Sequence, residues 1–519
     1  MRGVHSIIDD ARRNVFTEVA RLAYTGDYDS VDSIPYRIIP GEIARHRNDV
    51  FLERAVVAAR VKLALGMDLR PGAPREPLSQ RIRDAATDQK YFEEPLVNII
   101  TFACNACPEK QVRITDSCQG CVSHPCMNVC PKDAIYLDKF KRCHIDQDKC
   151  IRCGKCYNQC PYRAISKIER PCAAACGMDA IGSDEEGRAR IDYDKCVSCG
   201  MCLVNCPFGA IADKSQIFQL IHAMKHGSQV IACVAPAFVS QFGDKVTPAK
   251  LRSAMRQIGF SDVVEVAIGA DLCTIEEAED FLKKVPAEQP FMGTSCCPAW
   301  SLMAKKLFPQ FKENISMALT PMVITARMVK RDHPDARIVF IGPCAAKKLE
   351  ANRKSVRSDV DFVLTFEELQ GMFDAKDIDF ETLEAAPGDD LDEGSAMGRG
   401  FASSGGVAAA VVEAVRHIAP SVQMKYMAAE GLRDCRKMLM LAKAGKYDGY
   451  LLEGMACPGG CVAGAGTIAS VRDGAAAVER FRMQAAEKST VSSPYLDRLE
   501  EVIESGAVTS APAKSAEEQ

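Results

Sequence analysis

The first part of the chain repeats apolar residues with the period of an amphipathic helix. One predicted helix has an apolar face made of Val15, Phe16, Val19, Leu22 and Ala23, with Gly26 as its stop. A second predicted stretch, from about 42 to 65, carries Val50, Phe51, Val57, Val61 and Leu65 and ends at Gly66. No cysteine and no catalytic signature occurs before residue 99. We therefore predict that residues 1–98 form a helical cap or docking region.

The pattern differs after about residue 220. Short β-rich runs, Val230–Val234 and Ile338–Ile341, alternate with helical stretches such as Ala249–Ile258 and Phe366–Phe373. This alternation predicts an α/β domain with mainly parallel sheets, which we place at residues 216–490. Residues 491–519 are expected to form a C-terminal helix and then a disordered tail, rich in Ala, Ser, Lys and Glu, from about Ser505.

The middle segment, residues 99–215, is defined by its cysteines. It holds 17 of the 25 cysteines in the chain. A Cys-x3-Cys unit followed by Ala-Ile recurs four times, at Cys126/Cys130, Cys156/Cys160, Cys172/Cys176 and Cys202/Cys206. Four copies indicate two tandem bacterial-ferredoxin-like (α+β) modules, each built from a pair of half-repeats.

The spacing within this segment is typical of 4Fe–4S clusters. The motif C-x2-C-x2-C-x3-C-P occurs twice, at Cys150, Cys153, Cys156 and Cys160 and at Cys196, Cys199, Cys202 and Cys206. Three cysteines of such a run bind one cluster and the fourth binds its neighbour. Crossing the ligands in this way predicts three clusters. Their ligand sets are Cys118, Cys121, Cys126 and Cys160; Cys130, Cys150, Cys153 and Cys156; and Cys176, Cys196, Cys199 and Cys202.

Four cysteines then remain for a further cluster. Cys104 and Cys107 form a CxxC pair without partners, and Cys172 and Cys206 lack a CxxC pair in their own half-repeats. Joining them gives a fourth ferredoxin-type cluster. A zinc ribbon is the alternative, because Cys104, Cys107, Cys118 and Cys121 have zinc-ribbon spacing. Cys143 is left spare, and the cysteines outside all motifs, Cys233, Cys273 and Cys435, are expected to be packed thiols.

A different chemistry is indicated by three cysteine segments in the α/β region. Cys296 and Cys297 are adjacent in Thr-Ser-Cys-Cys-Pro-Ala-Trp, and adjacent side chains point in different directions. One of the two is therefore expected to ligate a metal and the other to remain free for chemistry. Gly-Pro-Cys-Ala-Ala-Lys-Lys supplies Cys344 and Lys347, and Met-Ala-Cys-Pro-Gly-Gly-Cys supplies Cys457 and Cys461.

These three segments, in this order, resemble the signature motifs of the iron-only (FeFe) hydrogenases, in a monomeric, ferredoxin-rich branch. The resemblance covers residues 100–485 and implies that four cysteines hold a catalytic cubane, with Cys461 bridging to a two-iron unit that carries CO, cyanide and a dithiolate. Together these groups form the H-cluster. The implied ligands are Cys297, Cys344, Cys457 and Cys461. Cys296 takes the role of proton relay and Lys347 that of a donor to cyanide, whereas Lys348 is expected to be solvated.

Further site residues follow from the same resemblance. Glu277, in the acidic stretch after Cys273, is expected to follow Cys296 in the proton path, and Ser316 to come next. Pro236 and Met455 are expected to border the cofactor. The chain also departs from the family pattern: Asp280 stands where a Glu is expected, Lys284 for Arg, Gly342 for Met and Met322 for Gln, and Ala237 lacks a hydroxyl that some members carry.

Charge and composition limit the kinds of partner and the cellular compartment that we expect for this chain. The net charge is only −4, which gives no reason to expect nucleic acid or an anionic membrane as a partner. Many CxxC clusters, with no signal-like or membrane-spanning apolar stretch, predict a reduced cytoplasmic protein. The resemblance implies interconversion of H2 with protons and electrons, and as partners ferredoxin or another redox protein and the hydrogenase maturation proteins. The alternatives are a non-catalytic iron–sulfur electron carrier or assembly protein, and an H2 sensor.

Overall fold

The structure, a computed structural model, describes residues 5–69, 77–91, 94–353, 356 and 359–504. The predicted disordered tail from Ser505 lies outside the described residues. Helix α1 (Ile7–Thr25) begins at a Ser6–Asp9 capping box and stops at Gly26, whose φ of 78° suits glycine. The other N-terminal helices are α2 (Ile34–Ile38), α3 (Val50–Ala64) and α4 (Ile82–Ala85).

Two expectations for this region are wrong. Residues 42–49 are not helical, so α3 begins at Val50, behind the Asp49 cap. Phe51 does not join the apolar face, because its side chain is 72% exposed. Helix α1 packs on α15 (Phe366–Ala375) and α9 (Ile217–Lys225), so the N-terminal helices share a core with the α/β domain.

The cysteine-rich segment forms two modules of the same design, each with a pair of two-stranded antiparallel sheets. In the first module β2 (Gln111–Ile114) pairs with β5 (Ile165–Ile168), and β3 (Ile135–Leu137) pairs with β4 (Cys143–Ile145). In the second, β1 (Val97–Ile99) pairs with β8 (Ile211–Asp213), and β6 (Ile181–Ser183) pairs with β7 (Ala189–Ile191). The short helices are α5 (Pro125–Asn128), α6 (Lys155–Gln159), α7 (Pro171–Ala174) and α8 (Met201–Asn205).

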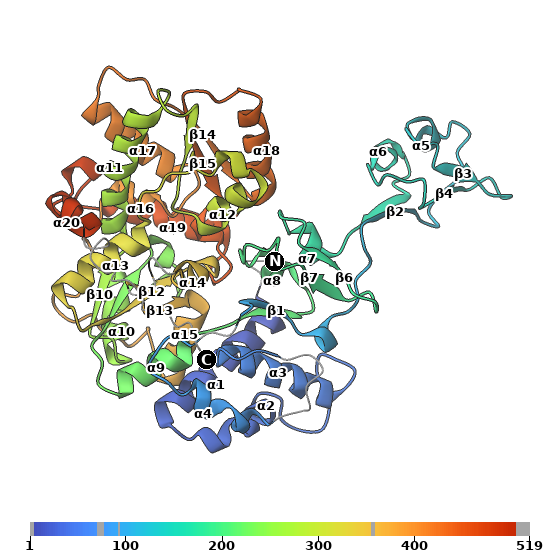
Figure 1. The fold of residues 1–519 in the computed structure, drawn as a ribbon. Coiled ribbons are helices and arrows are strands. Elements are labelled where there is room, and N and C mark those ends of the chain that lie inside the picture. Colours follow the sequence, from blue (N-terminus) through green and yellow to red (C-terminus); the bar gives the residue numbers. More distant parts are fainter. Residues whose placement is uncertain (1–4, 70–76, 92–93, 354–355, 357–358, 505–519) are drawn as a thin grey trace, which may run out of the picture.

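The modules are nested along the chain rather than strictly consecutive. The strand β1 lies before the first module in the sequence but pairs with β8 at the end of the second. The chain therefore starts the second module at residue 97, leaves it to build the first, and returns at α7 to finish it. Figure 1 shows the first module, with β2 to β5, projecting from the body of the molecule.

The α/β domain contains two parallel sheets, which confirms the predicted class. The larger has the order β10-β9-β12-β13 and the smaller the order β11-β15-β14. The strands are β9 (Val230–Val234), β10 (Asp262–Glu265), β11 (Phe291–Gly293), β12 (Arg337–Gly342), β13 (Phe362–Thr365), β14 (Lys425–Glu430) and β15 (Tyr450–Met455). The apolar runs of β9, β11, β12, β13 and β15 are buried because helices cover the sheets, whereas the edge strand β14 is largely exposed.

The helices of this domain include those that carry or support the candidate site. They are α10 (Pro248–Gln257), α11 (Ala267–Lys284), α12 (Pro298–Leu307), α13 (Pro321–Asp332), α14 (Ala346–Glu350), α16 (Ala396–Gly400), α17 (Gly406–Ile418), α18 (Leu432–Lys443), α19 (Val471–Gln484) and α20 (Leu499–Glu504).

Candidate active site and cysteine cavities

The three cysteine segments of the α/β domain meet at the carboxyl ends of parallel strands. Cys296 and Cys297 follow β11, Cys344 follows β12, and Cys457 follows β15. Open parallel sheets place their ligand sites at this edge. The segments enclose a cavity of about 840 Å³ between the two sheets. Its lining includes Pro236, Ala237, Cys296, Cys297, Met322, Cys344, Lys347, Phe401, Met455, Cys457 and Cys461.

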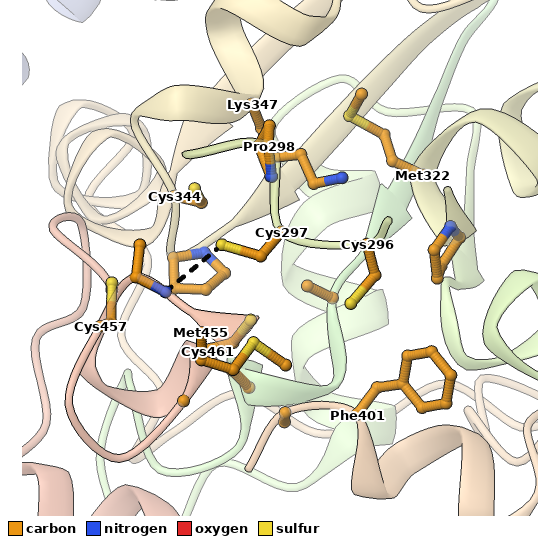
Figure 2. A pocket seen from close by; sticks show the side chains of 18 of the residues that line it. Cys296, Cys297, Pro298, Met322, Cys344, Lys347, Phe401, Met455, Cys457 and Cys461 are labelled. Carbon is orange, nitrogen blue, oxygen red and sulfur yellow. Dashed lines mark hydrogen bonds between the residues drawn. The ribbon is translucent and has the colours of Figure 1, made fainter. Parts of the chain in front are cut away.

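The backbone sets the direction of each sulfur. Cys297 is the N-cap of α12, with Pro298 at its first turn, and the Cys297 Sγ accepts a hydrogen bond of 3.5 Å from the Ala456 N–H. Figure 2 shows this bond, with the Cys297 sulfur on the side of Cys344 and Cys457 and the Cys296 side chain leaving in another direction. The two adjacent side chains thus point in different directions.

Cys461 reaches the cavity through a turn formed by two glycines, and both positions favour glycine over any other residue. Gly459 and Gly460 have φ values of 99° and 89°, in the left-handed region. A Cβ on Gly460 would stand 2.5 Å from the backbone N of Ser404. The turn therefore brings Cys461 back beside Cys457 at close backbone contact with the segment that follows α16.

A buried carboxyl group stands behind the Cys296 loop. Glu277, on α11, accepts hydrogen bonds at Oε1 from the Ser295 N–H (2.9 Å) and the Ser295 hydroxyl (3.1 Å). Its Oε2 is buried and has no hydrogen-bond partner among the described residues. Burial raises the pKa of Glu277 to about 7, against the opposing effect of hydrogen bonds from Ser295 and Ser316. This carboxyl group can gain or lose a proton near neutral pH.

The same helix continues this polar line toward solvent. Asp280 lies one turn after Glu277 and is ion-paired with Lys284 at 2.7 Å. Both side chains are about a quarter exposed. Asp280 and Lys284, which stand where the family pattern has Glu and Arg, thus contact each other. Two polar residues near this line, Ser295 and Glu276, were not predicted as site residues from the sequence. Burial raises the pKa of Glu276 to about 7, and its Oε2 accepts from the Leu319 N–H.

The two lysines of the Cys344 segment differ from each other. The ammonium group of Lys347 lines the cavity, lies 2.7 Å from Glu350 Oε2 and contacts Thr320 Oγ1 at 3.4 Å. The prediction that Lys348 is solvated is wrong. Its side chain is 2% exposed and pairs with Asp213 and Glu368, both at 2.9 Å. Because Asp213 belongs to β8, Lys348 ties the second module to the α/β domain.

Each of the four predicted ferredoxin-type ligand sets lines a cavity of its own. Three of the cavities have volumes of about 330 Å³ and one of about 370 Å³. The crossed pattern is reproduced: Cys160 lies with Cys118, Cys121 and Cys126; Cys130 with Cys150, Cys153 and Cys156; Cys176 with Cys196, Cys199 and Cys202; and Cys206 with Cys104, Cys107 and Cys172. The four cysteines of the zinc-ribbon alternative are divided between two cavities.

One of these four cavities lies next to the large cavity of the α/β domain. Cys199 lines both the cavity of its own set and the large cavity of the α/β domain. The set with Cys176 is therefore the one next to the candidate active site. Cys104, Cys107, Cys172 and Cys206 complete the same module, and the other two sets lie in the projecting first module.

The remaining cysteines fall into two groups. Cys233, Cys273 and Cys435 are buried, as expected of packed thiols. Cys143 is not simply spare, because its Sγ lies 3.7 Å from the Cys126 Sγ and it lines the cavity of that set. Among the described residues, no helix combines the length and apolar character needed to cross a membrane.

Comparison with known proteins agrees with the geometry. Residues 228–465 match the family model "Iron only hydrogenase large subunit, C-terminal domain". Residues 144–166 and 188–211 each match a "4Fe-4S binding domain" model. The chain therefore contains 4Fe–4S binding domains ahead of a domain that matches the C-terminal domain of the iron-only hydrogenase large subunit.

Three relatives cover different extents of the chain. Iron hydrogenase 1 of Clostridium pasteurianum is 29% identical over 72% of this chain and 73% of its own length. The periplasmic [Fe] hydrogenase large subunit of Nitratidesulfovibrio vulgaris is 30% identical over 63% of this chain and 87% of its own. The cytosolic iron-sulfur assembly component 3 of Bos taurus is 25% identical over 43% of this chain and 57% of its own.

Proposed function

Because this chain belongs to the iron-only hydrogenase family, we propose that it is a hydrogenase that interconverts H2 with protons and electrons. One observation carries the proposal. A cysteine that is free of the ligand set, Cys296, lines the four-cysteine cavity, and the buried carboxyl group of Glu277 stands directly behind its loop. A protein that only stores or carries electrons has no need of a proton-transfer pair at this place.

The donor set and the size of the cavity fit the family's cofactor. Cys297, Cys344, Cys457 and Cys461 would hold a 4Fe–4S cubane, since thiolates are its preferred ligands. The cavity, at about 840 Å³, is more than twice as large as each of the four cysteine-lined cavities of the ferredoxin-like modules. The additional space would take the two-iron unit, attached through Cys461. When bound, that unit supplies the metal site at which protons and electrons become H2.

The residues of the chain would then bind, orient and move protons. The Lys347 ammonium group offers hydrogen-bond donors to an anionic cyanide ligand, and its ion pair with Glu350 holds it in place. The Cys296 thiol exchanges a proton at Sγ with the buried cofactor. Glu277 passes that proton on, with Ser295 and Ser316 fixing its carboxylate, and Asp280 and Lys284 lead to solvent. Apolar walls, among them Pro236, Met322 and Met455, exclude water from the cavity.

Electrons would reach this site through four ferredoxin-type 4Fe–4S clusters, each in one of the four-cysteine cavities. We propose ferredoxin or another acidic redox protein as the partner. Residues 111–168, the projecting first module, contain ten Lys and Arg against five Asp and Glu, although the whole chain is acidic. Opposite charge favours encounter with an acidic partner at the entry to the chain of clusters.

An iron–sulfur assembly protein is the second candidate function, because relatives with that name share this domain. Infrared spectroscopy of the protein matured by the hydrogenase maturation proteins separates the two. We expect bands of iron-bound CO and cyanide together with H2 turnover from a reduced dye. A fully iron-loaded, matured sample without these bands and without turnover would favour the assembly function.

Iron analysis tests the number of clusters. Five cubanes require about 20 iron atoms per chain before the two-iron unit is inserted, at four irons each. Replacing Cys104 and Cys107 by Ser should remove about four of them and one reduction step, because both thiols belong to one ligand set. Full iron in the double variant, or bound zinc in the unchanged protein, would contradict the fourth cluster.

Arg170 is expected to set the reduction potential of this fourth cluster. Its guanidinium is buried, lines the cavity, and donates to the carbonyls of Cys107, Gly182 and Gly187. Burial raises the pKa of the Cys107 thiol, and the charge of Arg170 acts in the opposite direction. A buried cation favours the reduced, more negative cluster. Arg170→Gln should therefore lower its midpoint potential by about 60 mV, a tenfold change for one electron.

The control for this prediction is Arg188→Gln. Arg188 lies on the β6–β7 hairpin, whose Gly182 and Gly187 carbonyls accept from Arg170, but Arg188 is paired with Asp184 and Glu186 near the surface. It should leave the potential unchanged in an electron paramagnetic resonance titration, and Arg170→Lys should restore most of the shift. Equal potentials in the Arg170→Gln and unchanged proteins, at equal iron content, would refute the electrostatic role.

A further inference from the structure

The two ferredoxin-like modules have the same register, which allows their cavities to be compared position by position. In the first module Leu137 pairs with Cys143, and in the second Ser183 pairs with Ala189. Cys143 is the first residue of β4 and Ala189 the first residue of β7. Cys143 and Ala189 therefore occupy equivalent places.

The ligand cysteines are equivalent in the same way. Cys126 lies on α5 and Cys172 on α7, and each sits after a CxxC pair that follows the first strand of its module. Cys160 and Cys206 close the two sets. The cavity that holds Cys126 and Cys160 is thus lined by five cysteines, whereas its counterpart around Cys172 and Cys206 is lined by four cysteines and Ala189.

The fifth thiol is placed to act as a ligand. Cys143 is 97% buried, given a relative exposure of 3%, and its Sγ lies 3.7 Å from the Cys126 Sγ. An iron atom that bound the Cys126 sulfur would therefore have the Cys143 sulfur beside it. Cys126 also belongs to the widened half of the module, with four residues instead of two between it and Cys121.

We propose that Cys143 is a reserve ligand of the cluster held by Cys118, Cys121, Cys126 and Cys160, and that it can take the place of Cys126. In the exchange the bond between iron and the Cys126 sulfur breaks and the Cys126 thiolate takes up a proton, while the Cys143 thiol gives up its proton and its thiolate binds the same iron. No electron is transferred. The proposal rests on the proposed function only in that this cavity holds a 4Fe–4S cluster. The site in the second module has no such reserve, because Ala189 has no sulfur.

Site-directed variants with matched controls test the exchange. Cys126→Ala and Cys143→Ala should each retain the full iron content after anaerobic reconstitution, and the double variant should lose about four iron atoms. Cys172→Ala, the equivalent of Cys126→Ala in the second module, should lose about four irons by itself. In Cys126→Ala the cluster should remain with an altered paramagnetic resonance signal, because the position of one ligand sulfur has changed.

The possible results distinguish a failure of the reserve-ligand proposal from a failure of the proposed hydrogenase function. Loss of iron in either Cys126→Ala or Cys143→Ala would overturn the reserve ligand, and so would full retention in Cys172→Ala. Circular dichroism and the iron of the other clusters show whether the double variant still folds. An unchanged protein with four iron atoms too few would instead remove the cluster itself, whereas absent CO bands at full iron content would affect only the hydrogenase function.

Discussion

Cys461→Ala is expected to yield a folded protein that retains the iron of its ferredoxin-type clusters but shows no CO or cyanide bands and no measurable H2 turnover. The sulfur of Cys461 is the proposed link between the catalytic cubane and the two-iron unit. It reaches that place through the Gly459–Gly460 turn, whose positive φ values and close contact with Ser404 favour glycine. Alanine provides no thiolate, so the two-iron unit has nothing to attach to.

The measurement is infrared spectroscopy combined with iron analysis on matured protein. Cys233→Ala is a matched control, because Cys233 is a buried cysteine of the same domain but lies on β9 outside all ligand sets. It should keep both the bands and turnover, at a modest cost in stability for the lost sulfur. Persistent CO bands in Cys461→Ala would show that another residue makes the link.

The grouping of the cysteines is predictable from the sequence because it depends on local spacing. A C-x2-C-x2-C-x3-C-P run places three ligands of one cluster within one short segment, and the repeat indicates which cysteine crosses over. The structure brings together all four predicted sets, including Cys104 and Cys107 with Cys172 and Cys206. The three signature segments of the α/β domain also converge, since each follows a parallel strand.

What the sequence does not reveal depends on contacts between distant segments. The sequence predicts that Lys348 is solvated, because its partners Asp213 and Glu368 come from other parts of the chain. The role of Cys143 required the register of β3 with β4 and its comparison with β6 and β7. The nesting of the modules follows from the pairing of β1 with β8, two three-residue strands more than a hundred residues apart.

The second large expected effect is a loss of H2 turnover when the proposed proton path is interrupted. Cys296→Ser and Glu277→Gln are each expected to lower H2 turnover by about 10²-fold to 10⁴-fold, the contribution typical of a positioned acid or base. A serine hydroxyl has a pKa too high for easy proton exchange. Glutamine can keep the hydrogen bonds from Ser295 but carries no proton to pass on. The infrared bands and iron content should be unchanged, because neither residue is a proposed ligand.

Glu276→Gln is the control that isolates the path. Glu276 is adjacent to Glu277 and its pKa is also raised to about 7, but it accepts from Leu319 instead of the Cys296 loop. Its replacement should change turnover by less than about tenfold, below the range expected of a positioned acid or base. A comparable loss in Glu276→Gln would mean that the buried charge of α11, and not a route through Glu277, matters for activity.

The double variant decides whether Cys296 and Glu277 act in series. If every proton must pass through both groups, removing the second adds little once the first is gone, so the double variant should be about as slow as the slower single variant. Independent roles would multiply the two losses, giving about 10⁴-fold or more. Multiplied losses at intact infrared bands would therefore remove Glu277 from the route that begins at Cys296, and a different carboxyl group would have to receive its proton.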